Sequence, residues 1–186
     1  MMQALTKLLL RRKPKGSSEL MNEVEFWKIM HAAKEKAKGD FETQKVELGK
    51  MLMKRKPADI ASFDNRFYFI SNQLYHHDIW AAAKIIDGTC DDDCFDCFRE
   101  WLIGQGKEVV DTALQNPDSL ADYEIESNAD RVGLSLMAGN AFYFKTNAEL
   151  YPDYVLTIQY EIKGEPCEEN ELDGRLPNLF QKYRKN

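Results

Sequence analysis

The stretch that decides the fold is residues 57–74, PADIASFDNRFYFISNQL, which has the pattern of a single amphipathic helix. Its large apolar residues recur at steps of three and four: Ile60, Phe63, Phe67, Ile70 and Leu74. Residues at this spacing share one face of an α-helix, and such a face is expected to bury against a core. Pro57 suits the first helical turn, where a backbone N–H has no partner within the helix. The stretch therefore predicts a helix that packs along its whole length.

Similar patterns on both sides of this helix predict further short helices. Asn22 and Asp40 are good N-cap residues, because their side chains accept hydrogen bonds from the free N–H groups of a first turn. Asp91 occupies the same position before the periodic run Cys94, Phe98 and Trp101. The helices expected from these signals span residues 23–38, 41–52, 80–87, 92–104, 107–114, 130–144 and 176–183, with one more turn at 119–123.

The remaining segments are less regular. Residues 154–162 alternate apolar and polar side chains, which predicts an ordered connector or a short edge strand. Residues 165–173 are acidic and are expected to be irregular. The fold class expected overall is all-α: a single compact multi-helix domain over residues 21–183 with an irregular acidic C-terminal segment. Residues 1–20 are predicted to be a flexible basic N-terminal extension.

The charge pattern restricts the partners of this domain. The chain of 186 residues has a net charge of −6. Residues 1–20 carry five basic side chains and one acidic side chain, a net of +4, so residues 21–186 carry −10. An acidic domain repels phosphate backbones, so we expect no binding to double-stranded nucleic acid. No stretch has the ~20 apolar residues of a membrane span. The apolar run 8–10 is too short for a signal peptide, so a cytoplasmic location with free thiols is expected.

Several motifs of the chain resemble one bacterial family. They are MNEVEFW at 21–27, WAAAKIIDGTCDDDCF at 80–95, FREWLIGQG at 98–106, NPDSLA at 116–121, GEPCEENEL at 164–172 and LPNLF at 176–180. In these motifs the chain is similar to the family called domain of unknown function 4240, over residues 21–183. The resemblance implies a mainly helical domain. It implies no activity, and so it carries over no catalytic residues.

The densest chemistry lies between residues 76 and 99, which contain a histidine pair, three adjacent aspartates, three cysteines and an arginine. A structural interpretation is favoured. Asp91 would cap the helix, and Asp92 and Asp93 would favour the positive end of its dipole. Cys94 would face the core as a small hydrophobic residue. Arg99 would pair with a distant carboxylate or with surface groups near Glu100.

Three functional interpretations stay open beside it. Cys90, Cys94 and Cys97 with a histidine would suit tetrahedral zinc, but only Cys94 and Cys97 have the usual Cys-x-x-Cys spacing, so we expect no tightly bound zinc and no other cofactor. A catalytic site would use His76 or His77 as base, with Asp92, Asp93 and Arg99 beside it and Cys94 as nucleophile. These candidates are weak, because no phosphate loop or nucleophile motif accompanies them. Alternatively, Asp92, Asp93 and Arg99 form an exposed patch that contacts a partner protein.

The sequence therefore favours a non-enzymatic domain that binds another protein. An immunity or regulatory role beside a bacterial toxin or stress system is one instance of such a function. The alternative is a hydrolase-type or metal-dependent enzyme that uses the region from His76 to Arg99.

Overall fold

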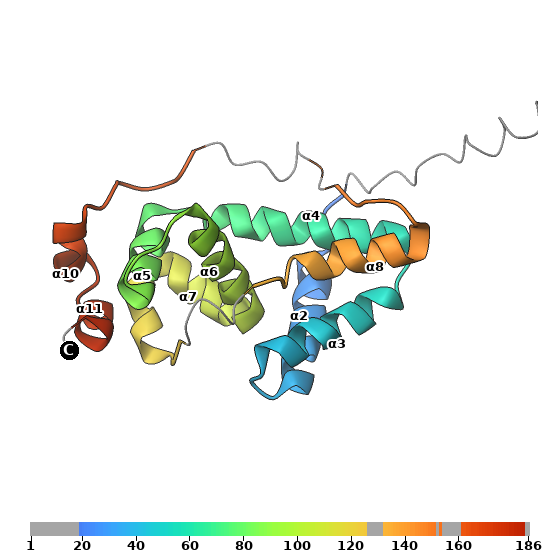
Figure 1. Ribbon diagram of the computed structural model, residues 1–186, viewed down its shortest axis with the longest axis horizontal. Coiled ribbons are helices and arrows are strands. Elements are labelled where there is room, and N and C mark those ends of the chain that lie inside the picture. The colour runs from blue at the N-terminus through green and yellow to red at the C-terminus, as the bar shows by residue number, and fades with distance from the viewer. Residues whose placement is uncertain (1–18, 126–131, 152, 154–160, 185–186) are drawn as a thin grey trace, which may run out of the picture.

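The computed structural model describes residues 19–125, 132–151, 153 and 161–184 (Figure 1). These parts form α-helices and short 3-10 helices, and no strand occurs within them. The prediction of an all-α fold is confirmed. Most of the described chain is helical because most of it has apolar side chains at helical spacing and polar caps between the periodic segments.

The central helix is α4, Pro57–Gln73, which extends across the bundle in Figure 1. The predicted stripe is buried along its whole length: Ile60, Phe63, Phe67, Ile70 and Leu74 expose between 0% and 4% of their surface. Against it pack α2, Glu23–Ala37, and α8, Leu136–Thr146. The ring of Phe26 in α2 lies 4.8 Å from the ring of Phe63, so aromatic side chains fill the space between the two helices.

The predicted caps fix where the first helices begin. The Asn22 side chain accepts from the N–H groups of Val24 and Glu25, at 3.0 and 3.3 Å. The Asp40 carboxylate accepts from the N–H group of Thr43 at 2.6 Å, at the start of α3, Phe41–Met53. α3 packs against both α2 and α8. These contacts confirm both predicted N-cap residues.

The second half of the bundle contains α5, His77–Asp87; α6, Asp92–Gln105; α7, Lys107–Gln115; and η1, Pro117–Asp122. Asp91 caps α6 as predicted, since its carboxylate accepts from the N–H group of Cys94 at 2.9 Å. Gly88, with a φ of +82°, ends α5 in a conformation that favours glycine. The loop of residues 88–91 therefore turns the chain sharply, and α5 and α6 pack together.

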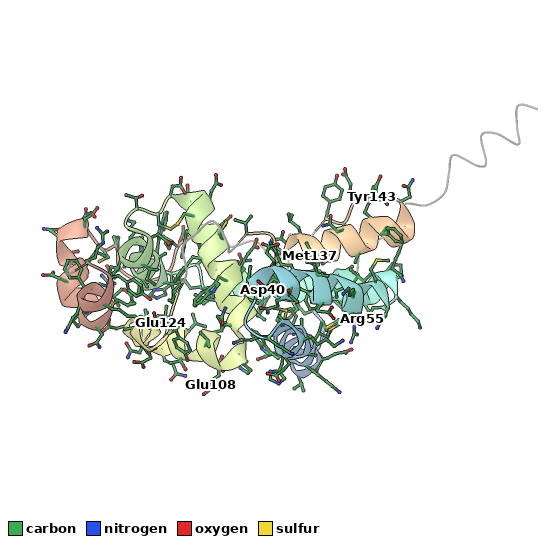
Figure 2. The ribbon with its side chains drawn as sticks, turned by 60° about the horizontal axis from the view of Figure 1, so that its bottom comes forward. Asp40, Arg55, Glu108, Glu124, Met137 and Tyr143 are labelled. Atoms are coloured by element: carbon green, nitrogen blue, oxygen red, sulfur yellow. A yellow bond between two sulfur atoms is a disulfide. The ribbon has the colours of Figure 1, made fainter. Side chains whose placement is uncertain are left out.

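Helix α8 is shorter than predicted, because residues 132–135 are not helical and residues 126–131 lie outside the described parts. Gly133 has a φ of +95°, which is incompatible with a regular helix. Large apolar side chains also lie on the outer face of α8: Leu136, Tyr143 and Phe144 are 59%, 54% and 78% exposed. Figure 2 shows Tyr143 projecting outward from this helix.

The C-terminal segment is more regular than predicted. Residues 169–175, expected to be irregular up to residue 173, form the 3-10 helix η3, Glu169–Glu171, and the short helix α10, Leu172–Arg175. The difference arises from a capping box between Glu168 and Glu171, which sequence analysis overlooked. The final helix is α11, Pro177–Tyr183, close to the predicted span.

The predicted edge strand at 154–162 lies mostly outside the described residues. Where the chain is described again, Lys163 forms an isolated parallel bridge with His76. The N–H group of His77 donates to the carbonyl of Lys163 at 2.9 Å, and the N–H group of Lys163 donates to the carbonyl of Tyr75 at 3.1 Å. These two bonds attach the C-terminal segment to the start of α5.

At the N-terminal end, the carbonyl of Glu19 accepts from the Asn65 side chain at 3.2 Å, and the N–H group of Met21 donates to the carbonyl of Ser62. Residues 1–18, the larger part of the predicted basic extension, lie outside the described residues. None of the described helices has the length and apolar content that crossing a membrane requires.

Candidate functional site

Three aromatic rings form a stack where α5 and α6 meet the turn that follows α4. The rings of Trp80 in α5 and Phe95 in α6 are nearly parallel, at an interplanar angle of 8° and a centroid distance of 4.9 Å. The ring of Tyr75, from the turn, stacks on Phe95 at 5.9 Å. Phe95 is the buried centre of this stack, with 1% of its surface exposed. The stack forms a rigid apolar wall behind the polar side chains of α6.

Arg99 lies against this wall, one helical turn after Phe95. The centre of its guanidinium group is 5.0 Å from each of the Tyr75 and Phe95 ring centroids, which are themselves 5.9 Å apart. These three distances form a triangle, so the cation lies over both rings rather than between them. Such contacts stabilise a desolvated cation by about 2 kcal/mol. Only 8% of Arg99 is exposed, so it is a buried charge with an aromatic environment.

The guanidinium group also makes polar contacts. Nη1 donates to the carbonyl and hydroxyl oxygens of Ser71, at 3.0 and 3.1 Å. Nη2 forms a salt bridge with Asp96, three residues earlier on the same helix. Nε is buried and has no hydrogen-bond partner within the described structure. Two of the three guanidinium nitrogens are therefore committed to α4 and α6, and Arg99 connects these two helices.

These side chains enclose a pocket of about 280 Å³. Its lining residues are Asn72, Tyr75, Asp92, Phe95, Asp96 and Arg99. Asp92 and Asp96 are exposed at the rim, while Arg99 and Phe95 are buried at the base. The lining carries two carboxylates, Asp92 and Asp96, and one cation, Arg99, so the net charge of the pocket is negative. An aromatic face beside carboxylates suits a small cationic group, such as a lysine or arginine head group.

The structure brings together some of the predicted site residues and separates others. Asp92 and Arg99 line the pocket, whereas Asp93, although exposed in the same helical turn, is not among its described lining residues. His77 is the first residue of α5 and is likewise not part of this lining. Its neighbour His76 is the N-cap residue of α5, because its Nδ1 atom accepts from the N–H group of Asp78 at 3.2 Å. The His76 side chain therefore caps the start of α5.

The prediction of free thiols is wrong for two of the three clustered cysteines. Cys90 and Cys94 form a disulfide, with their Cα atoms 5.2 Å apart. This separation arises because Cys90 lies in the turn before α6, while Cys94 lies in the first turn of the helix. The bond leaves Cys94 without the thiolate that the predicted nucleophile needs. The structure places the carboxylate of Asp87, rather than Cys97, beside the sulfur atoms of Cys90 and Cys94. Cys97 is therefore not grouped with the other two predicted zinc ligands.

Of the two expectations for Arg99, the distant carboxylate is wrong. Its carboxylate partner is Asp96, an exposed neighbour of Glu100 one helical turn earlier in α6. Asp96 precedes Arg99 by three residues and Phe95 precedes it by four, which are the spacings that bring side chains together on a helix. The i,i+3 rule would have found Asp96. Nothing in the local pattern indicates Tyr75 or Asn72, because their positions depend on how α4 and α5 pack against α6.

A larger groove lies between α2 and α3, far from this chemistry. It encloses about 660 Å³, and its described lining combines apolar side chains, such as Val24, Ile29 and Met51, with charged ones, including the ion pair of Glu25 and Arg55. None of the predicted site residues belongs to its described lining. The polar side chains of its described lining are all at least partly exposed, whereas the smaller pocket contains the buried Arg99, and so the smaller pocket is the better candidate site.

The fold and site define an all-α domain built around a buried arginine that lies on an aromatic stack. The chain belongs to the family described as protein of unknown function DUF4240, whose model matches residues 21–144. The matched part includes α2 to α7 and all residues of the pocket. The closing motif at 164–180 lies beyond the matched residues. No curated protein and no solved structure matches the chain.

Proposed function

We propose that this chain is a non-enzymatic protein-binding domain that recognises a basic partner through the pocket lined by Asp92, Asp96 and Tyr75. The observation that carries the proposal is the charge balance of this pocket. Its one cation, Arg99, is held by Ser71 and Asp96, while the Asp92 carboxylate remains exposed at the rim. A lysine or arginine side chain of a partner would contact the carboxylates and the tyrosine ring together.

The surrounding sequence supports a basic partner. Residues 87–100 carry six acidic side chains and one basic side chain, a net charge of −5. Complementary charges of this kind guide the encounter of two proteins and disfavour acidic competitors. Charge alone gives little affinity at a solvated surface. The pocket adds a partly desolvated position where one anchoring side chain contributes most of the binding energy.

An enzymatic function has less support in the described geometry. The sulfur of Cys94 is bonded to Cys90, and His77 lies at the start of α5 rather than in the pocket. The pocket therefore lacks a nucleophile with an adjacent base, which is the arrangement that covalent hydrolysis requires. A hydrolase-type function stays the second candidate. Cytoplasmic location, bacterial origin and an immunity or regulatory role are parts of the proposal that rest on sequence patterns.

The proposal can be tested with a matched pair of variants. Asp92→Asn and Asp93→Asn remove the same charge from the same exposed turn, but only Asp92 lines the pocket. The probe is a short arginine-containing peptide, with its glutamate analogue as control, titrated into isotope-labelled protein. We expect saturable amide shifts centred on residues 92–99, lost in Asp92→Asn and retained in Asp93→Asn. Shifts spread evenly over the acidic surface, or equal effects of the two variants, would contradict a pocket-based interface.

The partner itself can be sought with the same pair. Charge-reversed variants, Asp92→Lys and Asp93→Lys, serve as baits beside the unmodified chain in extracts of the source cells. A basic protein retained by the unmodified and Asp93→Lys baits, but not by the Asp92→Lys bait, would support the proposal. If the same proteins are captured by all three baits, the pocket does not select the partner.

A further inference from the structure

Asp87, Cys90 and Cys94 form a compact cluster of metal-ligating side chains outside the Arg99 pocket. One carboxylate oxygen and the two sulfur atoms lie within 4.8 Å of one another. Oδ2 of Asp87 is 3.6 Å from Sγ of Cys94. Both cysteines are buried, with 8% and 7% of their surfaces exposed. The cluster therefore has two soft donor atoms and one hard donor atom in a space the size of a single coordination sphere.

The backbone holds these three residues in place independently of the disulfide. Asp87 is the last residue of α5, and the positive φ of Gly88 turns the chain directly after it. The carbonyl of Cys90 accepts from Nε1 of Trp80 at 2.9 Å. The backbone N–H group of Cys94 donates a hydrogen bond to the carboxylate of Asp91, the N-cap residue. None of these backbone contacts involves the sulfur atoms, so reduction of the disulfide removes none of them.

We propose that the reduced chain binds a divalent zinc-like cation through Asp87, Cys90 and Cys94. Two thiolates and one carboxylate supply three ligands of a tetrahedral site, and the fourth position is left to water or to a further ligand. The inference does not rest on the proposed partner interface.

The chemistry makes the site redox-gated. A dithiol reductant transfers two electrons and two protons to the disulfide, which gives two thiols and the oxidised, cyclic disulfide of the reductant. Binding of the cation then releases the two thiol protons to solvent. The sulfur atoms bind either each other or the metal, so the oxidised chain cannot hold the cation in this way.

This inference departs from the expectation of no tightly bound zinc. That expectation required paired Cys-x-x-Cys motifs and took Cys97 as the third ligand. In the folded chain the third ligand is Asp87, which precedes Cys90 by three residues across the turn at Gly88. The spacing of the site is therefore Asp-x-x-Cys-x-x-x-Cys, which sequence analysis did not consider.

The test uses Co²⁺ as a spectroscopic substitute for zinc, added to untagged full-length protein after anaerobic reduction or after oxidation. We expect the reduced chain to bind one ion with tetrahedral d–d bands and a thiolate charge-transfer band, which zinc then displaces. The oxidised chain should show neither band. Cys94→Ser should abolish the charge-transfer signal. The isosteric Asp87→Asn should weaken binding at least as much as the roughly 10-fold cost of losing an outer-shell contact.

Cys97→Ser and Cys167→Ser are the matched controls, since both cysteines lie outside the disulfide and outside the cluster. Both variants should bind cobalt as the unmodified chain does. The proposal is overturned if the reduced chain binds no cobalt or if both redox forms bind it equally. It is also overturned if Cys97→Ser removes the signal while Asp87→Asn leaves it intact. Asp87→Asn keeps both cysteines, so its result stays interpretable if Cys94→Ser unfolds.

Discussion

The carboxylate of Asp118 caps the beginning of α11 from the other side of a helix interface, by accepting hydrogen bonds from Asn178. Oδ2 of Asp118 accepts from the Asn178 side chain at 2.7 Å and from its backbone N–H group at 3.1 Å. Oδ1 accepts from the N–H group of Leu179 at 2.9 Å. Asp118 belongs to the NPDSLA motif and Asn178 to the LPNLF motif, so this contact joins two motifs that are 60 residues apart.

Replacement of Asp118 by alanine should therefore loosen the C-terminal helix. The carboxylate is 7% exposed, and its loss leaves backbone donors of α11 without a partner. Hydrogen bonds to charged groups contribute about 1.5–3 kcal/mol, and a loss of this size is expected in denaturant melts. Amide hydrogen exchange of residues 177–183 should accelerate most. Asp122→Ala, an exposed carboxylate on the same short helix, is the control and should change little. Equal effects of the two variants would mean that the cap is unimportant.

Gly164 allows the C-terminal segment to approach His76. A methyl group at position 164 would lie 2.3 Å from Cε1 of His76, and the φ of Gly164 is +80°. Gly164→Ala should therefore destabilise the fold, since the unfavourable φ alone costs about 1–3 kcal/mol. The matched control is Gly174→Ala, because no atom of the described residues lies within 4 Å of its added methyl group. In a His76→Ala background the Gly164→Ala penalty should shrink, because the clash with the imidazole is gone. An undiminished penalty would show that the ring is not the cause.

Local rules predicted the helices well, because helix signals are short-range. The stripe from Ile60 to Leu74 and the caps at Asn22, Asp40 and Asp91 all depend on residues at most one or two turns apart. The all-α class follows from the same patterns, whereas the family was indicated by the resemblance of separate motifs. The beginning of α8 was misplaced, because Gly133 adopts a positive φ that the surrounding periodicity does not reveal.

The candidate site could be predicted only in part, because most of its contacts depend on tertiary packing. Asp96 and Arg99 are close in sequence, and their pairing was available from helical spacing. Tyr75 reaches Arg99 through the packing of α4 against α6, and no local pattern encodes that approach. The disulfide was missed for a related reason. Cys94 follows Cys90 by four positions, but the turn at 88–91 changes their relative direction before the helix begins.

Two glycines in helices should respond to alanine in opposite ways. A methyl group at Gly139 in α8 meets no atom of the described residues within 4 Å, so Gly139→Ala should stabilise the protein by about 0.5–1 kcal/mol. A methyl group at Gly104 in α6 would lie 2.8 Å from the ring of Phe41 and 3.2 Å from Leu134. This crowding should outweigh the same gain in helix propensity, since overpacking costs about 1–3 kcal/mol. Thermal melts of the two variants should shift in opposite directions. A stabilised Gly104→Ala variant would show that Phe41 yields easily.

The three adjacent aspartates at the start of α6 should contribute unequally to stability. The carboxylate of Asp91 accepts a hydrogen bond from the N–H group of Cys94, so Asp91→Ala should lower the free energy of unfolding by about 0.5–2 kcal/mol. Asp92 and Asp93 are exposed in the first turn, where the helix dipole favours each by only about 0.3–1 kcal/mol. Salt should weaken the contributions of Asp92 and Asp93 more than the contribution of the Asp91 cap, because exposed charges are screened. Denaturant melts of the single alanine variants at low and high salt measure this. A loss above ~3 kcal/mol for Asp92→Ala or Asp93→Ala would exceed any surface effect.

The stability of the fold should fall between acidic and neutral pH because of one carboxyl group in α4. Asp64 is 5% exposed, and burial raises its pKa from 3.8 to about 7. Between these two values the folded chain holds a proton that the unfolded chain has released. Its contribution to stability is therefore complete below the unfolded pKa and is lost as the pH rises through the folded pKa. Each unit of difference corresponds to about 1.4 kcal/mol, so the loss is on the order of 4–5 kcal/mol.

Asp64→Asn should remove this dependence, because asparagine has the same shape and stays neutral at every pH. The two proteins should have similar stability at acidic pH, where Asp64 is protonated in both folded and unfolded chains. Above neutral pH the variant should be the more stable one. The free energy of unfolding, measured in denaturant at several pH values, gives the difference curve directly. This curve should be flat below pH ~4 and should rise toward pH ~7. A curve that is flat throughout would mean that the folded chain holds Asp64 ionised, with a favourable environment for its charge.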